Sequence, residues 1–398
     1  MHDRAWLYCA VFARSVATGM MGVLLGIYLA EIGIGTAASG IIITLGLAGA
    51  AFATLGVTLF ADRVGHRRSL LLVTVLSVAG AIVAAIASHP ALLGLAAFVA
   101  MLNGMGRDRG AALVVEQAAL PATVSERERT LAFAKYNVLQ DVGHAVGSLC
   151  AAAPSLLQQV AALEPVPAFR ASMWLYALLS LLPLLAYLRL SSAIEQRRTP
   201  ATRVSRDTRR ILWRISGLFA IDSIAGGFLT TALLSYFFYQ RFGVTVDTLG
   251  VLFFAARIAN AVSHLAAAWL ARHIGLVNTM VFTHIPSSLL LMTVAFMPTF
   301  PIAAALFLLR ESLVEMDVPT RQSYVMAVVQ PSERTVASGV THLVRLGGWA
   351  IAPAIAGVLM TGTSLAAPIL LGAAMKVLYD VALWRSFRNL PPPEERQA

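Results

Sequence analysis

Long apolar segments separated by short polar ones run along nearly the whole chain. Each is long enough to cross a bilayer as a helix, which takes about 20 residues. We expect twelve spans, at 5–31, 38–61, 69–88, 91–120, 130–155, 168–189, 209–239, 246–271, 276–296, 301–328, 335–361 and 364–387. A helix satisfies its backbone polar groups within the segment, whereas a membrane β-barrel would show short alternating segments. The pattern therefore predicts an all-α polytopic membrane protein.

The composition agrees with this class. Of 398 residues, 58% are hydrophobic and only 13% are charged, too few polar side chains to cover a soluble protein of this length. The net charge of +10 is spread over short loops between spans, which argues against nucleic-acid binding. The first apolar segment is read as a retained span rather than a cleaved signal. Cys9 and Cys150 are expected near opposite membrane faces, so no disulfide is expected.

Arginine placement predicts the orientation in the membrane. Basic residues gather in the turn 62–68, in the segment 191–210 and in the tail around Arg385. The loops on the opposite side carry few, with Arg170 and Arg241 as the main exceptions. Because cytoplasmic loops are enriched in lysine and arginine, we expect both termini in the cytoplasm and the protein in the inner (cytoplasmic) membrane.

The chain divides near its midpoint at a polar, basic, proline-containing segment. We expect an N-terminal six-helix bundle at 1–190, a cytoplasmic linker at 191–208 and a C-terminal six-helix bundle at 209–398. The tripeptide Glu-Arg-Thr follows span four as Glu128–Thr130 and recurs after span ten as Glu333–Thr335. This recurrence indicates an internal repeat that relates the two halves.

The turn between the second and third spans carries a family signal. Its pattern is Gly-x-Leu-Ala-Asp-Arg-x-Gly-Arg-Arg, and the matching residues are Ala61, Asp62, Arg63, Gly65 and Arg67. The chain departs from the pattern at Thr58, Phe60 and His66. In this turn, and in its helix count and repeat, the chain resembles transporters of the major facilitator superfamily along its whole length.

The resemblance implies two six-helix bundles in which spans one, four, seven and ten line a central cavity. It also implies that the turn acts as a cytoplasmic latch, with Asp62, Arg63 and Arg67 in gating. Gly65 would permit the tight reversal. Glu116, near the inner end of span four, is assigned to the same latch. The alternative is that the arginines only anchor the cytoplasmic face.

Two charges of opposite sign occupy related positions in the two halves. Arg14 lies in the middle of span one and Asp222 in the middle of span seven. Ionisable groups at this depth are costly unless they are paired or hydrated, so both are candidates for function. They are interpreted as the poles of a binding site or as a pair, and a purely structural pair remains an alternative.

Span four holds three consecutive charges, Arg107, Asp108 and Arg109. At 100° per residue they do not all face one point. We expect Arg107 or Asp108 in the cavity, with the flanking glycines allowing close approach or local unwinding of the helix.

Span ten is also rich in charge. Arg310, Asp317 and Arg321 share one face by their spacing, while Glu311 and Glu315 form a second stripe. Two acids one turn apart in a medium of low dielectric constant suit proton carriage. For Asp317 and Arg321 we favour a structural clasp.

Span five supplies Asp141 and His144, three residues apart, which suit a proton relay. A structural hydrogen bond between them is the alternative. The sequence has no Cys/His cluster of the kind that binds a metal and no nucleotide-binding loop, so neither metal nor cofactor is expected. No nucleophile–base arrangement indicates an enzyme.

These features predict a secondary transporter that moves a small organic solute by alternating access with proton coupling. Family prevalence favours efflux, although the stretch Gly143–Ser148 lacks the proline of the family's antiporter signature. The buried arginines favour an organic anion, so proton-coupled uptake of such an anion is an alternative. A non-transporting membrane sensor or scaffold is a third reading. The expected partners are the solute, the proton and the lipid bilayer, with the protein a monomer and no nucleic acid bound.

Overall fold

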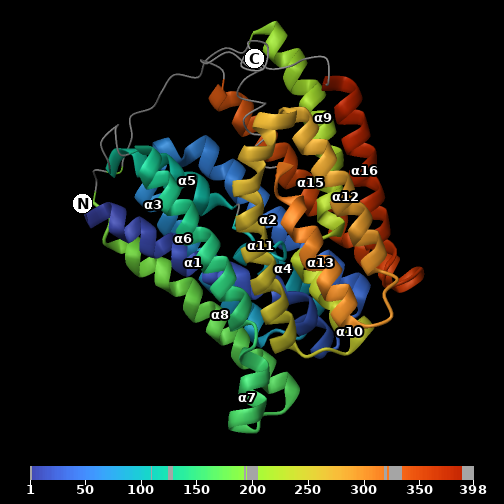
Figure 1. The fold of residues 1–398 in the computed structure, drawn as a ribbon. Coiled ribbons are helices and arrows are strands. Elements are labelled where there is room, and N and C mark those ends of the chain that lie inside the picture. Colours follow the sequence, from blue (N-terminus) through green and yellow to red (C-terminus); the bar gives the residue numbers. More distant parts are fainter. Residues whose placement is uncertain are drawn as a thin grey trace. The chain divides into compact units, whose positions relative to one another are not determined.

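The computed structural model describes residues 2–108, 110–123, 129–191, 194, 205–317, 321 and 334–387. Within them the chain is helical almost throughout and contains no strand (Figure 1). The α-helices are α1 (His2–Glu31), α2 (Thr36–Val64), α3 (His66–Ile86), α4 (Pro90–Ala100), α5 (Ala111–Ala119), α6 (Arg129–Cys150), α7 (Ala153–Ala161), α8 (Pro165–Leu188), α9 (Arg206–Phe228), α10 (Thr231–Phe242), α11 (Val246–Ile274), α12 (Leu276–Val294), α13 (Phe300–Val314), α15 (Arg334–Gly362) and α16 (Ala367–Phe387). The predicted all-α class is confirmed.

Nine helical segments in the described residues are long and apolar enough to cross a membrane. They coincide with nine of the twelve predicted spans. The other three predicted spans correspond to α4 with α5, to α6, and to α13. Span four is interrupted by an irregular stretch, α6 contains many polar residues, and span ten continues outside the described residues. A criterion of length and hydropathy therefore does not select these three segments.

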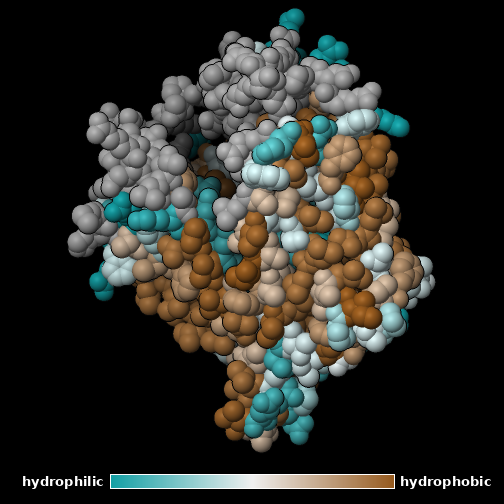
Figure 2. Space-filling model, viewed as in Figure 1, coloured by the Kyte–Doolittle hydropathy of each residue, from teal (hydrophilic) through white to brown (hydrophobic). Residues whose placement is uncertain are grey.

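Hydrophobic side chains cover the outward surfaces of the long helices. Figure 2 shows these residues over most of the visible face, with hydrophilic residues gathered toward helix ends, including the end of α7. Large apolar side chains such as Phe52, Trp213 and Phe296 are 66%, 76% and 66% exposed. Exposed apolar surface of this extent is typical of contact with lipid.

Two predicted spans are broken. Span four, expected as one helix at 91–120, ends at Ala100 and resumes at Ala111. Met101 and Gly106 take positive φ values of 55° and 65°, and the Asn103 side chain hydrogen-bonds the backbone N–H of Met105 and the carbonyl of Arg107. These interactions replace helical hydrogen bonds, and the described residues 101–108 and 110 form an irregular segment, here called segment 101–110.

Span seven is broken between Phe228 and Thr231. The Thr230 hydroxyl accepts a hydrogen bond from the backbone N–H of Leu233 at 3.3 Å and so caps the N-terminus of α10. The expected single helix at 209–239 is therefore two helices, α9 and α10.

The chain forms two compact units. Unit 1 contains Met1–Thr199, Thr230–Phe254 and Pro353–Gly362; unit 2 contains Pro200–Leu229, Ala255–Ala352 and Thr363–Ala398. Unit 1 thus includes α10, the start of α11 and the end of α15. The division into bundles at 1–190 and 209–398 with a linker at 191–208 stays a prediction.

In unit 1, glycines bring α1 close to α6. A Cβ atom at Gly147 would clash with the carbonyl oxygen of Val16, and one at Gly19 with the carbonyl oxygen of His144. Small residues at such crossings let two backbones approach. The crossing places Arg14 of α1 against polar side chains of α6.

In unit 2, glycines likewise allow α15 and α16 to pack closely against α9. A Cβ at Gly348 of α15 would lie 2.6 Å from the Cβ of Ser223, and one at Gly372 of α16 would lie 2.9 Å from the carbonyl oxygen of Ala225. Asp222 is adjacent to these crossings, so the packing carries its carboxylate into the interior of unit 2.

Candidate functional site

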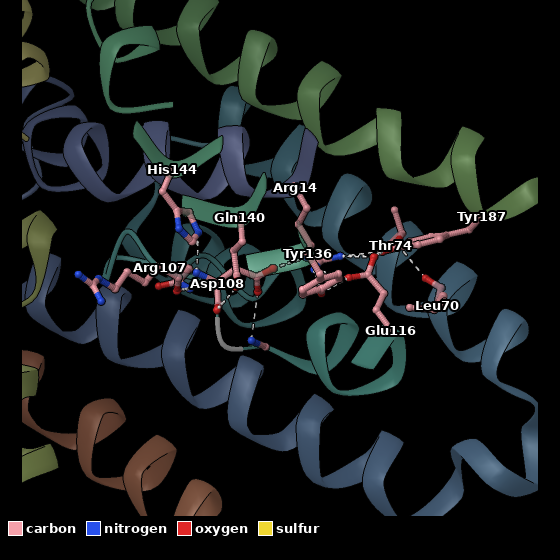
Figure 3. A network of polar contacts seen from close by, with 12 residues as sticks. Arg14, Leu70, Thr74, Arg107, Asp108, Glu116, Tyr136, Gln140, His144 and Tyr187 are labelled. Atoms are coloured by element: carbon pink, nitrogen blue, oxygen red, sulfur yellow. Dashed lines mark hydrogen bonds and ion pairs between the residues drawn. The ribbon is translucent and has the colours of Figure 1, made fainter. Parts of the chain in front are cut away.

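The guanidinium of Arg14 is the centre of a polar cluster in unit 1 (Figure 3). Its Nε–H donates to Asp108. Nη1 donates to Glu116 at 2.8 Å and to the Tyr187 hydroxyl at 2.7 Å. Nη2 donates to Glu116 at 2.6 Å and to the Tyr136 hydroxyl at 3.4 Å. Arginine has five N–H donors, and all five are engaged here.

Both carboxylate oxygens of Glu116 accept hydrogen bonds from more than one side chain. Its side chain is fully buried, and its two oxygens also accept hydrogen bonds from Tyr136 and Tyr187, each at 2.5 Å. The sequence placed Glu116 in a latch with the basic turn. In the structure Glu116 binds Arg14, which reaches α5 from the facing helix α1, and its part in a latch stays a prediction.

Side chains of α6 fix the irregular segment 101–110. The ring Nε2 of His144 accepts the backbone N–H of Asp108 at 2.9 Å, and the Gln140 amide donates to the Asp108 carbonyl at 3.1 Å. The side chain of Arg107 points away from the Arg14 cluster (Figure 3). His144 is buried and Asp141 is exposed on the same helix, and a relay between them stays a prediction.

A small cavity in unit 1 reaches Arg14 and Asp108. Its volume is about 70 Å³, which is room for a few water molecules, since one water needs about 10–15 Å³. Its polar lining residues include Thr18, Thr74, Ser77, Asn103 and Ser180. The cluster beside the cavity has two carboxylates and one guanidinium. The cavity is therefore large enough for water molecules beside the Arg14–Asp108 pair.

Asp222 is the centre of a second cluster, in unit 2. One carboxylate oxygen accepts from Lys376 at 2.8 Å; the other lies 3.2 Å from Arg321 and 3.9 Å from Arg345. Arg321 also pairs with Asp317 at 2.6 Å, the clasp expected from their spacing. Arg14 and Asp222 thus each have ion-pair partners within their own unit.

The second cluster extends into two helices that the sequence did not single out. The Lys376 ammonium also lies 3.3 Å from Nε2 of His284, whose Nδ1 is 2.9 Å from Asp380. A signal was available: Lys376 and Asp380 are one turn apart in an apolar span, and His284 lies in another. The rule that marks intramembrane ionisable residues as candidates applies to all three.

Glu311 of span ten has partners outside the Asp222 cluster. Glu311 pairs with its neighbour Arg310 and accepts a hydrogen bond from Asn260 at 2.9 Å. Arg310 and Glu311 are buried and Glu315 is half-buried. Proton carriage by the Glu311–Glu315 stripe stays a prediction.

The basic turn begins α3 and contacts the end of α8. Gly65 has a φ of 99°, which favours glycine. Arg67 donates to the carbonyls of Tyr187 at 3.3 Å and Leu188 at 2.7 Å, and Arg63 is exposed. The side chain of Asp62 and all of Arg109 lie outside the described residues. The gating role of the turn stays a prediction.

Comparison with known proteins gives a consistent picture. Residues 7–345 match the family model described as Major Facilitator Superfamily. The uncharacterized membrane protein YJR124C of Saccharomyces cerevisiae is 22% identical over 430 residues, covering 99% of this chain and 96% of that protein.

Solved transporter structures share the fold. A crystal structure of a variant of the nucleoside transporter NupG has a TM-score of 0.78 and 15% identity, covering 97% of this chain and 100% of that one. The peptide transporter POT in complex with sulfate has a TM-score of 0.75 and 13% identity, covering 98% and 94%. At these identities the likeness concerns the fold alone.

Proposed function

This chain belongs to the major facilitator superfamily, and we propose that it is a proton-coupled secondary transporter that moves a small organic solute by alternating access, with export as the favoured direction. The observation that carries the proposal is a buried charge cluster in each unit. Replacing a buried ion pair by apolar residues is often neutral or stabilising. Charges kept at this depth therefore favour a role in handling a solute or an ion.

Alternating access is supported by a seam inside unit 1, where α10 meets α1 and the irregular segment 101–110. The Ser235 hydroxyl donates to the Val23 carbonyl at 2.5 Å, and the Tyr239 hydroxyl donates to Glu31 at 2.7 Å. Thr231 donates to the carbonyl of Met105 at 2.8 Å. These contacts join α10, from the predicted C-terminal half, to the N-terminal half.

A second seam joins α2 to the end of α15. Gly40 and Gly357 pack together so closely that a Cβ on either would meet the other's backbone, and the backbone N–H of Ala354 donates to the Thr44 hydroxyl at 2.9 Å. Seams made of small residues and single hydrogen bonds can separate and re-form without deforming their helices. This is what a gate requires.

The state of the arginines bears on the solute class. Because all five donors of Arg14 are engaged, it offers none to a solute anion. Arg345 differs: it lies 3.9 Å from Asp222 and 4.8 Å from the centroid of the Trp349 ring, and its Nε has no hydrogen-bond partner among the described residues. Arg345 favours the second candidate function, proton-coupled uptake of an organic anion, because a guanidinium binds carboxylate or phosphate.

The test is transport by the purified protein in lipid vesicles that contain a trapped pH indicator. The solutes are nucleosides, dipeptides, and carboxylate and phosphate anions, each with and without an imposed pH gradient. We expect one class to change the lumenal pH and to accumulate when the gradient is applied. Equal transport with and without the gradient would remove the proton from the proposal, and no transport of any class would overturn it.

A matched pair of variants ties the result to the clusters. Asp222→Asn should abolish gradient-driven accumulation. Arg170→Gln should leave it intact, because Arg170 is a peripheral arginine that donates to the Ile86 carbonyl at 3.1 Å and to Ser88 at 2.5 Å. Loss of accumulation in both variants would contradict the assignment of Asp222.

A further inference from the structure

Four side chains in unit 2 form a continuous buried chain of polar contacts, here called the α12–α16 relay. Asp222 of α9 binds Lys376 of α16 at 2.8 Å; Lys376 lies 3.3 Å from His284 of α12; and His284 lies 2.9 Å from Asp380, one turn along α16. His284 and Asp380 are each 1% exposed. The relay thus links three helices through one imidazole.

The hydrogen-bond chemistry defines the resting state of the ring. An ammonium group only donates, so Nε2 of His284 must accept from Lys376. A carboxylate only accepts, so Nδ1 carries the proton and donates to Asp380. His284 is therefore neutral in this arrangement, and one further proton on Nε2 is the change that the ring can undergo.

We propose that His284 binds and releases the coupling proton, and that Lys376 transmits the change to Asp222. The inference rests on the proposed proton-coupled transport and identifies where its proton binds. An N–H bond forms at Nε2, and the hydrogen bond from Lys376 to Nε2 breaks. Lys376 keeps its proton and its bond to Asp222, while the imidazolium stays paired with Asp380.

The charged groups around the relay determine the direction in which Lys376 moves when His284 is protonated. An imidazolium and an ammonium at 3.3 Å repel each other, so protonation drives Lys376 away from α12 and toward Asp222. There Lys376 competes with Arg321 and Arg345 for the same carboxylate. Protonation of His284 on α12 thereby changes the electrostatic environment of the arginines that face Asp222.

The other neighbours of His284 do not replace this function. Tyr379 of α16 meets the ring edge-on, with centroids 6.3 Å apart. The adjacent helix α13 carries Arg310 and Glu311, which pair with each other. His284 is the one titratable residue of α12.

The first test follows the α2–α15 seam as a function of pH and needs no solute. The full-length protein carries Thr44→Cys and Ala354→Cys, with Cys9→Ser and Cys150→Ser, and is reconstituted in vesicles. Nitroxide labels on the two cysteines report the seam by pulsed electron paramagnetic resonance, and we expect the ratio of separated to closed seam to change at least ten-fold between pH 5 and pH 9. His284→Gln and Lys376→Met should reduce that change to less than two-fold.

The matched control is His273→Gln, which alters an exposed histidine of α11 whose ring contacts the Trp269 carbonyl. It should retain the full pH response. A ratio of separated to closed seam that is independent of pH with the relay intact, or a full response in His284→Gln, would overturn the inference.

A second measurement does not depend on the folding of His284 variants. With ¹⁵N-labelled histidine in the otherwise unmodified protein, one buried imidazole should pass from neutral to protonated within this pH range. The ring-current shift from Tyr379 identifies its signal, which should move in Tyr379→Leu. A His284 ring that stays neutral throughout overturns the inference.

The outcomes separate this inference from the proposed function. If no solute is transported but His284 titrates and the seam responds, the relay stands and the transport proposal fails. If a pH gradient still drives full accumulation in His284→Gln, the transporter stands and the relay fails.

Discussion

The clusters of unit 1 and unit 2 pair helices that the predicted repeat makes equivalent, with the charges exchanged. In unit 1, Arg14 of span one binds Glu116 of span four; in unit 2, Asp222 of span seven binds Arg321 of span ten. The repeated Glu-Arg-Thr supports the equivalence, because Glu116 precedes its copy, and Arg321 precedes the second copy, by the same number of residues. The two halves keep the connection and invert its sign.

The clusters differ in how completely they are satisfied. In the described part of unit 1, Ser15 supplies the one buried side-chain polar atom without a hydrogen-bond partner. Among the described residues of unit 2 there are several such atoms, including Nε of Arg345 and Nη2 of Arg321 in the Asp222 cluster. Fully satisfied networks rigidify a core, whereas spare polar atoms are available to a ligand or a rearrangement. The comparison therefore assigns stability to the Arg14 cluster and change to the Asp222 cluster.

The largest expected effect is that of Arg14→Met. It leaves Asp108 and Glu116 buried without their cation, and breaking a buried pair costs about 3–5 kcal/mol. We expect a strong fall in thermal stability in detergent and little folded protein.

The control adds Glu116→Gln to Arg14→Met. It removes one of the stranded charges, and most of the lost stability should return. A double variant no more stable than Arg14→Met alone would show that Arg14 contributes by packing and not by charge.

The effect of Asp222→Asn on stability should be smaller. Arg321 retains Asp317 as a partner, and the amide oxygen of the introduced Asn can still accept a hydrogen bond from Lys376. The expected loss is therefore about 1.5–3 kcal/mol, that of hydrogen bonds to a charged group. The measurement is the unfolding temperature in the same detergent as for Arg14→Met. A loss equal to that of Arg14→Met would break the contrast between a locked cluster and an adjustable one.

Two glycine substitutions compare the helix crossings themselves. A Cβ at Gly147 would lie 2.1 Å from the carbonyl oxygen of Val16, whereas a Cβ at Gly348 would overlap less, at 2.6 Å from the Cβ of Ser223 and 3.1 Å from the backbone nitrogen of Ile224. Overpacking costs about 1–3 kcal/mol, and we expect Gly147→Ala near the upper end and Gly348→Ala near the lower. Equal unfolding temperatures for the two variants would indicate that the crossings are equally tight.

The smallest expected effect is that of His144→Phe. It removes the acceptor for the backbone N–H of Asp108, and a hydrogen bond of this kind contributes about 1 kcal/mol. Amide hydrogen exchange at Asp108 should accelerate. His144→Gln, which keeps an acceptor, is the comparison, and the same acceleration in both variants would mean that the ring's acceptor is not what protects the amide.

Hydropathy was enough to predict the fold class, because the apolar composition of each span reflects the lipid that surrounds it. Hydropathy did not predict the breaks at 101–110 and at Leu229–Thr230, although the glycines of span four had allowed for local unwinding at the first. The first depends on the Asn103 side chain and on α6, and the second on a threonine cap. Such competition between side chain and helix is settled by neighbouring helices that periodicity does not identify.

The site was predictable residue by residue but not in its pairings. Arg14, Asp108 and Asp222 stand out because charge is rare in apolar segments. Glu116 was selected without its partner Arg14, since helical spacing relates residues of one helix and not of two. Tyr136 and Tyr187 give no such signal, because a tyrosine in a span is ordinary until its hydroxyl is seen to bind a carboxylate.

The saturation of Arg14 has a consequence for how this chain can diverge. Because every N–H donor of the Arg14 guanidinium is used, substitutions at positions 14, 108 and 116 depend on one another. A natural relative with an apolar residue at position 14 should also have given up a carboxylate at position 108 or 116. Any lineage that reached that state one substitution at a time passed through an ancestor less stable than either end point.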